Sequence, residues 1–277
     1  MSTPQPGILA APGPSGYCIE LDFHAGDANA AIERVIAALP KERGIYGIGA
    51  RFARKLGMSV PGLRELAPLS AKVSLAATPH DLFLFVSADS AGEAFDQADG
   101  LMSAARFDFQ IAEHCATFRY RDGRDITGFV DGTENPVGEE ARAAAIVRDG
   151  PLAGGSFAFV QRFHHDREKF EKLTPEAKNA VFGRSRIDNV ELEDAPPTAH
   201  VKRVDQKAWD PPMTILRKSM PWGDVARSGL QFLAFTCDLE RIDTLLARMV
   251  GAADEFSDSL LWYTRAETGA YYFCPPA

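Results

Sequence analysis

A carboxylate, Asp131, stands in a context that could hold it in a fixed position for chemistry. It lies between Gly128 and Gly132 in the segment GFVDGTENP. Glycine lets the backbone take positive φ or approach a ligand closely, and the closing Asn-Pro pair disfavours helix at the asparagine. The segment could therefore hold Asp131 at a fixed place against a flat or bulky group. Taken alone, the pattern favours a plain structural turn.

An imidazole and a guanidinium follow further along. His200 comes after a rigid proline pair in PPTAHVKR, which makes it a candidate ligand of fixed geometry, although a lone histidine is more often an ordinary surface or hydrogen-bonded residue. Arg217 lies in ILRKSMPWG, between an apolar run and the break at Pro221. That pattern is also typical of an edge strand with a surface arginine. The occurrence of the three residues together is what points to function.

Other groupings predict no site. The pair His164-His165 precedes Asp166, but adjacent residues of a strand point to opposite faces, so we expect a surface role rather than a metal pair. The four cysteines form no C-x-x-C motif, which gives no support to a disulfide framework, a zinc site or covalently attached haem. The glycines near residue 47 do not make the G-x-G-x-x-G loop of a nicotinamide site.

The composition is that of an ordinary globular protein, with 45% hydrophobic and 25% charged residues among 277. A net charge of −8 argues against nucleic acid or an anionic membrane as the main partner, since both require basic patches. Residues 1–16 are rich in Pro, Gly, Ala and Ser without an apolar signal region, and we expect a flexible leader. Scattered thiols favour a cytoplasmic location.

The elements that must position these residues follow a repeated pattern. We expect a strand near 17–23, a helix after Asp27, a strand at 82–87 and a helix at about 91–105. The second half has strands at 156–162 and 230–236, each followed by a helix, and the second of these helices carries Ile242, Leu245 and Met249 on one face. A strand-like apolar run followed by a helix-like pattern occurs in two similar segments, LFLFVSADSAGEAFDQADGLM and QFLAFTCDLERIDTLLARMVG.

This repeat predicts an α+β fold of two ferredoxin-like modules, with antiparallel sheets packed against helices. We place the modules at residues 17–140 and 141–277, after the leader. The Asp131 segment then lies near the joint between them, where pockets often form.

Several motifs together carry a family resemblance. GFVDGTENP, GGSFAFVQRFHHD, PPTAHVKRVD, ILRKSMPWGD, GLQFLAFTCDLERIDTLLARM and SDSLLWYTRAETGAYYFCP occur in this order. From about residue 17 onward the chain resembles the bacterial dye-decolourising peroxidases of the B-type branch. The resemblance implies one haem b per chain, held in a pocket of the C-terminal module.

It also implies roles for individual residues. His200 matches the proximal iron ligand, and Asp258 is the best match for the acidic acceptor of its second ring nitrogen, with Asp254 and Glu255 close by in sequence. The distal pair that relays a proton and stabilises charge matches Asp131 and Arg217, and either could dominate. The remaining implied positions are Ser219 as a distal polar donor where some relatives carry asparagine, Gly132 and Thr133 against the porphyrin, and Arg184 and Glu191 beside the propionates.

The implied activity is that of a haem peroxidase, which reduces H2O2 through a ferryl intermediate and oxidises phenolic, dye-like or other one-electron donors. The alternatives are a haem-handling protein that stores haem or removes its iron, and a non-catalytic module that has lost its cofactor. The resemblance further implies a homo-oligomer, a dimer or higher even assembly. No tail follows the final strand pattern, so we expect no encapsulin packaging through one.

Overall fold

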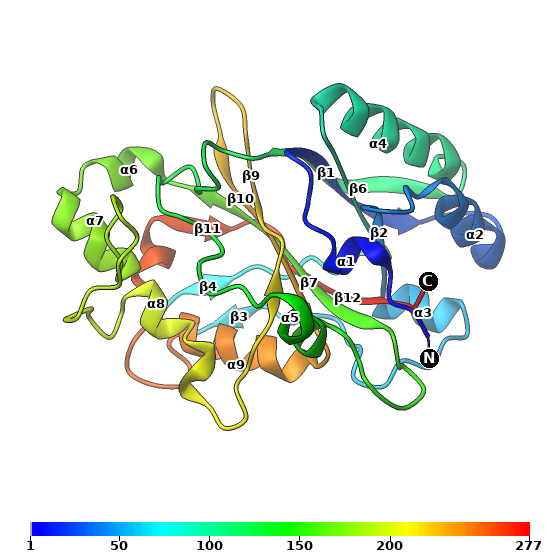
Figure 1. Ribbon diagram of the computed structural model, residues 1–277. Helices are drawn as coiled ribbons and strands as arrows, with labels where there is room; N and C mark the ends of the chain where they lie inside the picture. The colour runs from blue at the N-terminus through cyan, green and yellow to red at the C-terminus, as the bar shows by residue number, and fades with distance from the viewer. Residues whose placement is uncertain (1) are drawn as a thin grey trace.

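The computed structural model describes residues 2–277, and its two halves repeat one arrangement of strands and helices (Figure 1). The N-terminal half comprises α1 (Pro6–Leu9), β1 (Ser15–Phe23), α2 (Ala28–Ala38), β2 (Ile45–Gly49), α3 (Ala50–Lys55), β3 (Leu69–Ser70), β4 (Ser74–Leu75), β5 (Leu82–Ala88), α4 (Ala91–Ala105) and β6 (Phe109–Phe118). The strands and helices expected in this half are confirmed. Asp27 caps α2 by accepting from the Ala30 amide, and Ser90 caps α4 through Glu93.

The C-terminal half comprises α5 (Gly138–Ala145), β7 (Ser156–His165), α6 (Arg167–Glu171), α7 (Pro175–Phe182), α8 (His200–Arg203), the 3-10 helix η1 (Gln206–Ala208), β8 (Leu216–Arg217), β9 (Met220–Gly223), β10 (Ser228–Thr236), α9 (Leu239–Val250), the 3-10 helix η2 (Ser259–Trp262), β11 (Thr264–Ala266) and β12 (Ala270–Cys274). The expected strands and helices of this half are likewise present. Among residues 2–277, no helix combines the length and apolar character that a membrane span needs.

Eight of the strands form one closed antiparallel ring, which corrects the expectation of separate sheets; β8 and β11 pair beside it, and β3 and β4 form a small sheet of their own. The N-terminal strands run in the order β2-β5-β1-β6 and the C-terminal strands in the order β12-β7-β10-β9. β12 pairs with β2, and β6 pairs with β9 through Thr117 and Trp222. β7 pairs with β12 on one side and β10 on the other, so the ring has no open edge there. Joining the halves edge to edge satisfies backbone groups that two separate sheets would leave exposed.

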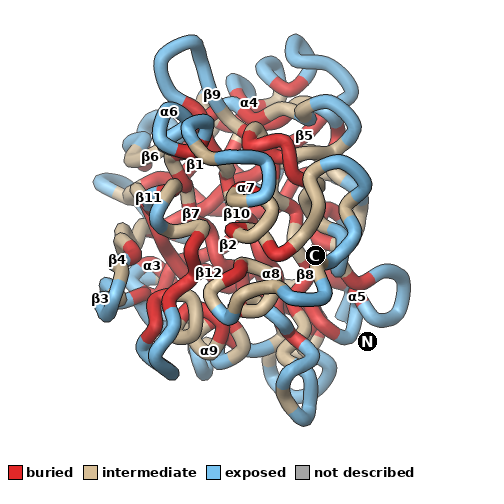
Figure 2. Tube along the Cα trace, turned by 90° about the vertical axis from the view of Figure 1, so that its left-hand side faces the viewer, coloured by how far each residue is buried: buried red, intermediate tan, exposed pale blue. Residues whose placement is uncertain are grey.

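Apolar side chains pack on both surfaces of this ring. Figure 2 shows that buried residues concentrate in its strands. Phe83, Phe235 and Tyr272 belong to the cluster that fills the interior, while α2 and α4 cover the outside of the N-terminal half. Ile242, Leu245 and Leu246 pack α9 against the outer face of the C-terminal half. The rest of that outer face is left for the cavity described below.

The N-terminal segment is ordered, and the expected flexible leader is wrong for residues 2–16. Ile8, on α1, is fully buried in the interior cluster. The Gln5 side chain donates to the carbonyl oxygens of Tyr46 and Pro275 at 3.0 and 2.9 Å and accepts from the Tyr46 amide. One apolar anchor and one bridging amide therefore fix a segment whose composition alone suggested mobility.

Candidate functional site

A cavity of about 930 Å³ opens on the outer face of the C-terminal half. Its walls come from the loop between β6 and α5, from α7 and α8, and from β8 and β10. The volume falls at the upper end of the range of about 300–1,000 Å³ typical of ligand and cofactor pockets. Seven of the residues expected from the sequence line it: Asp131, Gly132, Thr133, Arg184, Glu191, His200 and Arg217.

His200 stands at one wall with its ring orientation fixed. The Ala199 amide donates to the Pro196 carbonyl oxygen, and Ala199 is fully buried, so the chain is anchored where α8 begins. His200 Nδ1 lies 2.6 Å from Asp258 Oδ2, and Asp258 has no exposed surface. Asp258 also accepts from the Leu260 amide. With Nδ1–H donated to a carboxylate, Nε2 keeps its lone pair free for a ligand.

The neighbouring acids do not share this role. Asp254 accepts from Arg203 at 2.7 Å, so the structure brings Asp258 rather than Asp254 to the His200 ring. No group of three or more His, Cys, Asp or Glu side chains among residues 2–277 is arranged to hold a metal ion.

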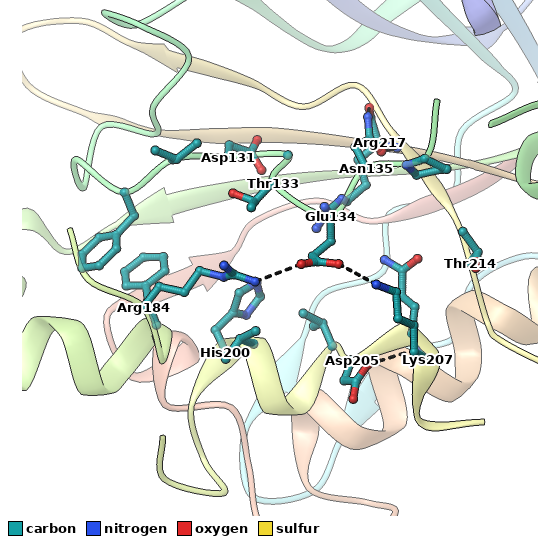
Figure 3. Close-up of a pocket in the computed structure, with 18 of the residues that line it drawn as sticks. Asp131, Thr133, Glu134, Asn135, Arg184, His200, Asp205, Lys207, Thr214 and Arg217 are labelled. Carbon is teal, nitrogen blue, oxygen red and sulfur yellow. Dashed lines mark hydrogen bonds and ion pairs between the residues drawn. The ribbon is translucent and has the colours of Figure 1, made fainter. Parts of the chain in front are cut away.

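Asp131 and Arg217 lie across the cavity from His200 (Figure 3). Gly128 and Gly132 both have left-handed φ, +90° and +78°, as the turn requires. Burial raises the pKa of Asp131; the positive charge of Arg217 opposes this shift and the negative charge of Asp125 adds to it. Within the described residues, Arg217 Nε is buried without a hydrogen-bond partner. An unpaired buried donor is costly, which points to a group that binds there.

Asn135 holds Arg217 in place and was not among the expected site residues. Its Nδ2 donates to the Arg217 carbonyl oxygen at 2.9 Å, and its Oδ1 accepts from the Arg217 amide at 2.8 Å. The sequence showed this asparagine inside GFVDGTENP but suggested only a turn before proline. A side chain that bonds the backbone of a residue far along the chain leaves no local signal.

Ion pairs cross the mouth of the cavity (Figure 3). Arg184 donates to Glu134 and Glu191 at 3.1 and 3.3 Å, and Lys207 donates to Glu134 at 3.0 Å. The Lys207 hydrogen bond lowers the pKa of Glu134. Lys202 pairs with Glu191 at 2.8 Å. Three cations thus gather around two carboxylates at a place where an anionic ligand could also be held.

The remaining expected positions differ in placement. The backbone at Gly132 borders open space, since a Cβ added there would meet nothing within 4 Å. Thr133 also faces the cavity, where its hydroxyl accepts from Asn189 at 2.8 Å. Ser219 does not line the cavity, and its buried hydroxyl has no partner within residues 2–277. The expected role of Ser219 as a distal donor stays a prediction.

His165 corrects the expectation of a surface role for the histidine pair. Only 7% of it is exposed, and its Nε2 lies 3.1 Å from Asp125 Oδ1. Burial alone would raise the pKa of Asp125, but the charge and hydrogen bond of His165, with donors from Thr127, hold it at about 2. Asp125 and His165 both line the cavity.

Comparisons with known proteins place this geometry in context. A family model described as "Dyp-type peroxidase, C-terminal" matches residues 122–277, more than half of the chain. The dye-decolorizing peroxidase of Mycolicibacterium paratuberculosis is 31% identical over 209 residues, which cover 72% of this chain and 58% of that protein. The chain spans less than two thirds of the length of the curated relatives it matches.

Two solved structures match almost the whole chain. The dye-decolorizing protein from V. cholerae is 33% identical with a TM-score of 0.90, covering 98% of this chain and 96% of that one. A DypB variant from Rhodococcus jostii RHA1, determined in complex with heme, is 28% identical with a TM-score of 0.91, covering 99% of this chain and 96% of that one.

Proposed function

The chain belongs to the dye-decolourising peroxidase family, and from this premise we propose that it is a haem b peroxidase, with one haem per chain. It would reduce H2O2 and oxidise phenolic, dye-like or other one-electron donors. The observation that carries the proposal is the 2.6 Å contact of His200 Nδ1 with the buried Asp258, which leaves Nε2 free toward a cavity with Asp131 and Arg217 across it. When bound, haem supplies an iron centre that takes up the peroxide and exchanges electrons.

The side chains that line the cavity fit a haem. A haem held by histidine would need a neutral imidazole nitrogen for its iron, space for peroxide, and partners for its two propionates. His200 offers the first, and the space before Asp131 and Arg217 offers the second. Arg184, Lys202 and Lys207 offer charge at the mouth. In this assignment Glu191 orients Arg184 and Lys202, and Gly132 and Thr133 lie against the porphyrin.

Asp258 would set the strength of the ligand. A carboxylate that accepts the Nδ1 proton increases the basicity of the ring and fixes its orientation. Asp258 is enclosed, so its attraction for the Nδ1 proton is weakly screened.

Asp131 and Arg217 would divide the work on peroxide. The Asp131 carboxylate, when ionised, can accept a proton from one peroxide oxygen and return it to the other, which leaves as water. The Arg217 guanidinium can stabilise negative charge on the departing oxygen, and its unpaired Nε and free fork are suited to that task. Because burial raises the pKa of Asp131, this carboxyl ionises at a higher pH than an ordinary aspartate does.

The proposal also covers the division into modules, the location and the assembly of the chain. We propose that residues 17–140 and 141–277 are ferredoxin-like modules, because each half places its first and third strands centrally. We propose that the protein is cytoplasmic and that it assembles as a homo-oligomer with an even number of subunits.

Haem storage or iron removal is the alternative function, and accumulation of iron-free porphyrin under reducing, peroxide-free conditions would favour it.

The test is a stopped-flow reaction of the haem-loaded protein with one equivalent of H2O2, followed by oxidation of a phenolic donor. We expect a rapid change in the haem spectrum that the donor reverses. The double variant Asp131→Asn with Arg217→Ala should slow the first phase by about 100-fold or more, since general acid–base and charge-stabilising groups each contribute about that factor. Unchanged peroxide turnover in the double variant would overturn the distal assignment.

A further inference from the structure

His165 separates the main cavity from a second, smaller one at the surface. It lines both the 930 Å³ cavity and a cavity of about 250 Å³. The smaller cavity lies between the start of α6 and the turn between β9 and β10, and its charged lining residues are Asp166, Arg167, Glu168, Asp224 and Arg227. His165 thus lies between a cavity at the surface and the space near Asp131.

Both ring nitrogens of His165 have a hydrogen-bond partner. Nε2 lies 3.1 Å from Asp125 Oδ1, an acceptor, so this nitrogen is placed to donate. Nδ1 lies 2.8 Å from Thr264 Oγ1, which also lies 3.2 Å from the His164 carbonyl oxygen. When the Thr264 hydroxyl donates to that carbonyl, its oxygen can accept from Nδ1–H, so the site can accommodate a ring that carries two protons.

The groups around this pair carry charges of both signs. Asp125 Oδ2 accepts from the Thr127 amide at 2.9 Å and from its hydroxyl at 2.5 Å, so the carboxylate stays ionised opposite Nε2. On the cavity side, Asp131 and Arg217 contribute one charge of each sign. On the surface side, three acids and two arginines surround the smaller cavity. No cation from the described residues bonds the ring itself, since its polar partners are Asp125 and Thr264.

The proposed reaction needs protons in a place the protein encloses. Reduction of peroxide is H2O2 + 2 e⁻ + 2 H⁺ → 2 H2O. A relay by Asp131 only moves a proton from one peroxide oxygen to the other and supplies none. Both consumed protons must reach the enclosed distal side, from water or from the proton that a phenolic donor releases on oxidation, while the donor supplies the two electrons, one at a time.

We propose that His165, held by Asp125 and Thr264, is the residue through which these protons pass from the surface cavity to the distal side of the main cavity. The inference rests on the proposed function. Nε2–H gives its proton to Asp125, which also lines the main cavity and passes the proton to water there, and the ring then recovers a proton from the side of the surface cavity. His165 supplies protons for electron-driven turnover and does not touch the reacting oxygens.

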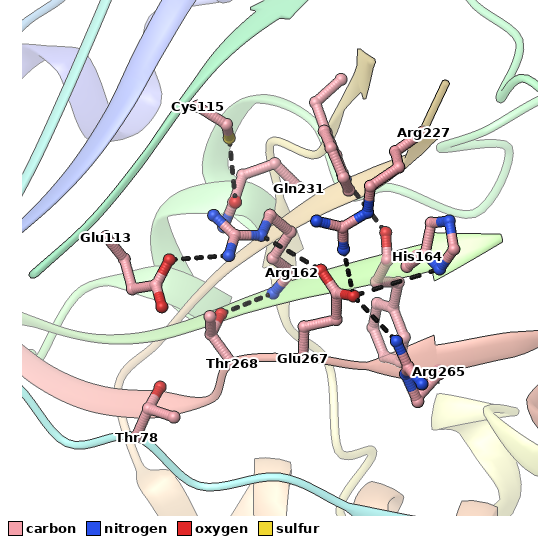
Figure 4. Close-up of polar contacts among 12 residues, drawn as sticks. Thr78, Glu113, Cys115, Arg162, His164, Arg227, Gln231, Arg265, Glu267 and Thr268 are labelled. Atoms are coloured by element: carbon pink, nitrogen blue, oxygen red, sulfur yellow. Dashed lines mark hydrogen bonds and ion pairs between the residues drawn. The ribbon is translucent and has the colours of Figure 1, made fainter. Parts of the chain in front are cut away.

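The adjacent histidine provides a matched control. His164 points to the opposite face of β7, where Nδ1 lies 4.0 Å from Glu267 and the ring lies beside Trp222 (Figure 4). It lines neither cavity. His164→Gln therefore changes the same residue type in the same strand without touching the proposed route.

The first arm of the test uses the haem-free protein. Proton–nitrogen NMR with labelled histidine, assigned by comparison with His165→Gln and His164→Gln, reads the ring protonation directly. We expect both His165 nitrogens to carry protons at pH 7. A neutral ring at that pH would overturn the inference even if the protein proved to be an active peroxidase. Because this arm needs no haem, it gives a result even if the proposed function fails.

The second arm uses the haem-loaded protein. We expect His165→Gln to keep haem uptake and the first reaction with H2O2 within about twofold of wild type. Turnover with saturating donor should fall by about 100-fold, as for the loss of a general acid. The loss relative to wild type should be larger at higher pH. His164→Gln should match wild type. Thr264→Val removes the partner of Nδ1 and should move the pH profile of turnover in the same direction. This variant tests the proposal if His165→Gln folds poorly.

Two outcomes of this arm would overturn the inference. One is turnover in His165→Gln within twofold of wild type with the same pH profile. The other is an equal loss in turnover and in the first peroxide reaction, which would mean that His165 only supports the shape of the cavity.

Discussion

The side-chain amide of Asn135 bonds both backbone polar groups of Arg217, donating to its carbonyl oxygen and accepting from its amide. These bonds join the loop that carries Asp131 to strand β8, 82 residues further along. They fix the separation between the two distal side chains without involving either side chain. The geometry of the proposed proton relay therefore depends on a residue outside it.

Replacing Asn135 tests this connection. Asn135→Ala leaves two partly buried backbone groups of Arg217 without partners, and each such group costs about 1–3 kcal/mol. We expect a lower free energy of unfolding in urea and a slower first reaction with H2O2. Asn135→Asp keeps the acceptor and loses the donor, so it should fall between alanine and wild type. An alanine variant equal to wild type in both measurements would show that Arg217 is held by other contacts.

Asp258 should control how tightly haem is held. Removing the acceptor of a ligating histidine typically costs about 10–100-fold in metal affinity. We expect Asp258→Asn to weaken haem binding by that order in an optical titration, and to shift the absorbance spectrum of the complex. Asp254→Asn is the control, because that acid pairs with Arg203 and not with His200. Equal effects of the two substitutions would contradict the assignment.

The cations at the mouth should contribute to affinity for the propionates. Hydrogen bonds to charged groups contribute about 1.5–3 kcal/mol, so Arg184→Ala should lower haem affinity by roughly tenfold or more. Lys172→Ala removes a cation of an exposed i,i+4 pair and should leave affinity unchanged. If haem affinity were insensitive to Arg184→Ala, the propionates would have to lie elsewhere.

A buried carboxyl inside the ring should make stability depend on pH. Burial raises the pKa of Glu20 to about 8, although the hydrogen bond from Tyr272 opposes the shift. A raised folded pKa means that stability is full below the unfolded value of 4.5 and falls as pH rises toward about 8. We expect urea unfolding to show a loss of a few kcal/mol over this range. Glu20→Gln should reduce that slope, and an unchanged slope would place the titration at another group.

Local elements could be predicted from the sequence because their causes are local. Asp27 and Ser90 cap helices through amides three residues away, and α9 carries its apolar face at helical spacing. Asp131, His200 and Arg217 were identified from motifs, and the structure brings all three to one cavity. The Asp258 contact was expected by resemblance, and the geometry distinguishes it from Asp254.

What sequence analysis missed depends on contacts between distant segments. Closure of the ring follows from the pairing of β12 with β2 and of β6 with β9, which no periodicity encodes. The leader is ordered because Ile8 fits the interior core. His165 is buried with Asp125, forty residues earlier in the chain, as the partner of its ring Nε2. Ser219 was expected at the cavity and is not among the residues that line it, so its role stays a prediction.

The most direct test of the central claim is the spectrum of haem bound to His200→Gly. We expect wild type to bind haem with a Soret band and an electron paramagnetic resonance signal of histidine-ligated ferric iron. His200→Gly should lose that signature, and added imidazole should restore it by occupying the vacated space beside Asp258. Wild-type ligation that persists in His200→Gly without imidazole would contradict the assignment of His200 as the iron ligand, and with it the proposed site.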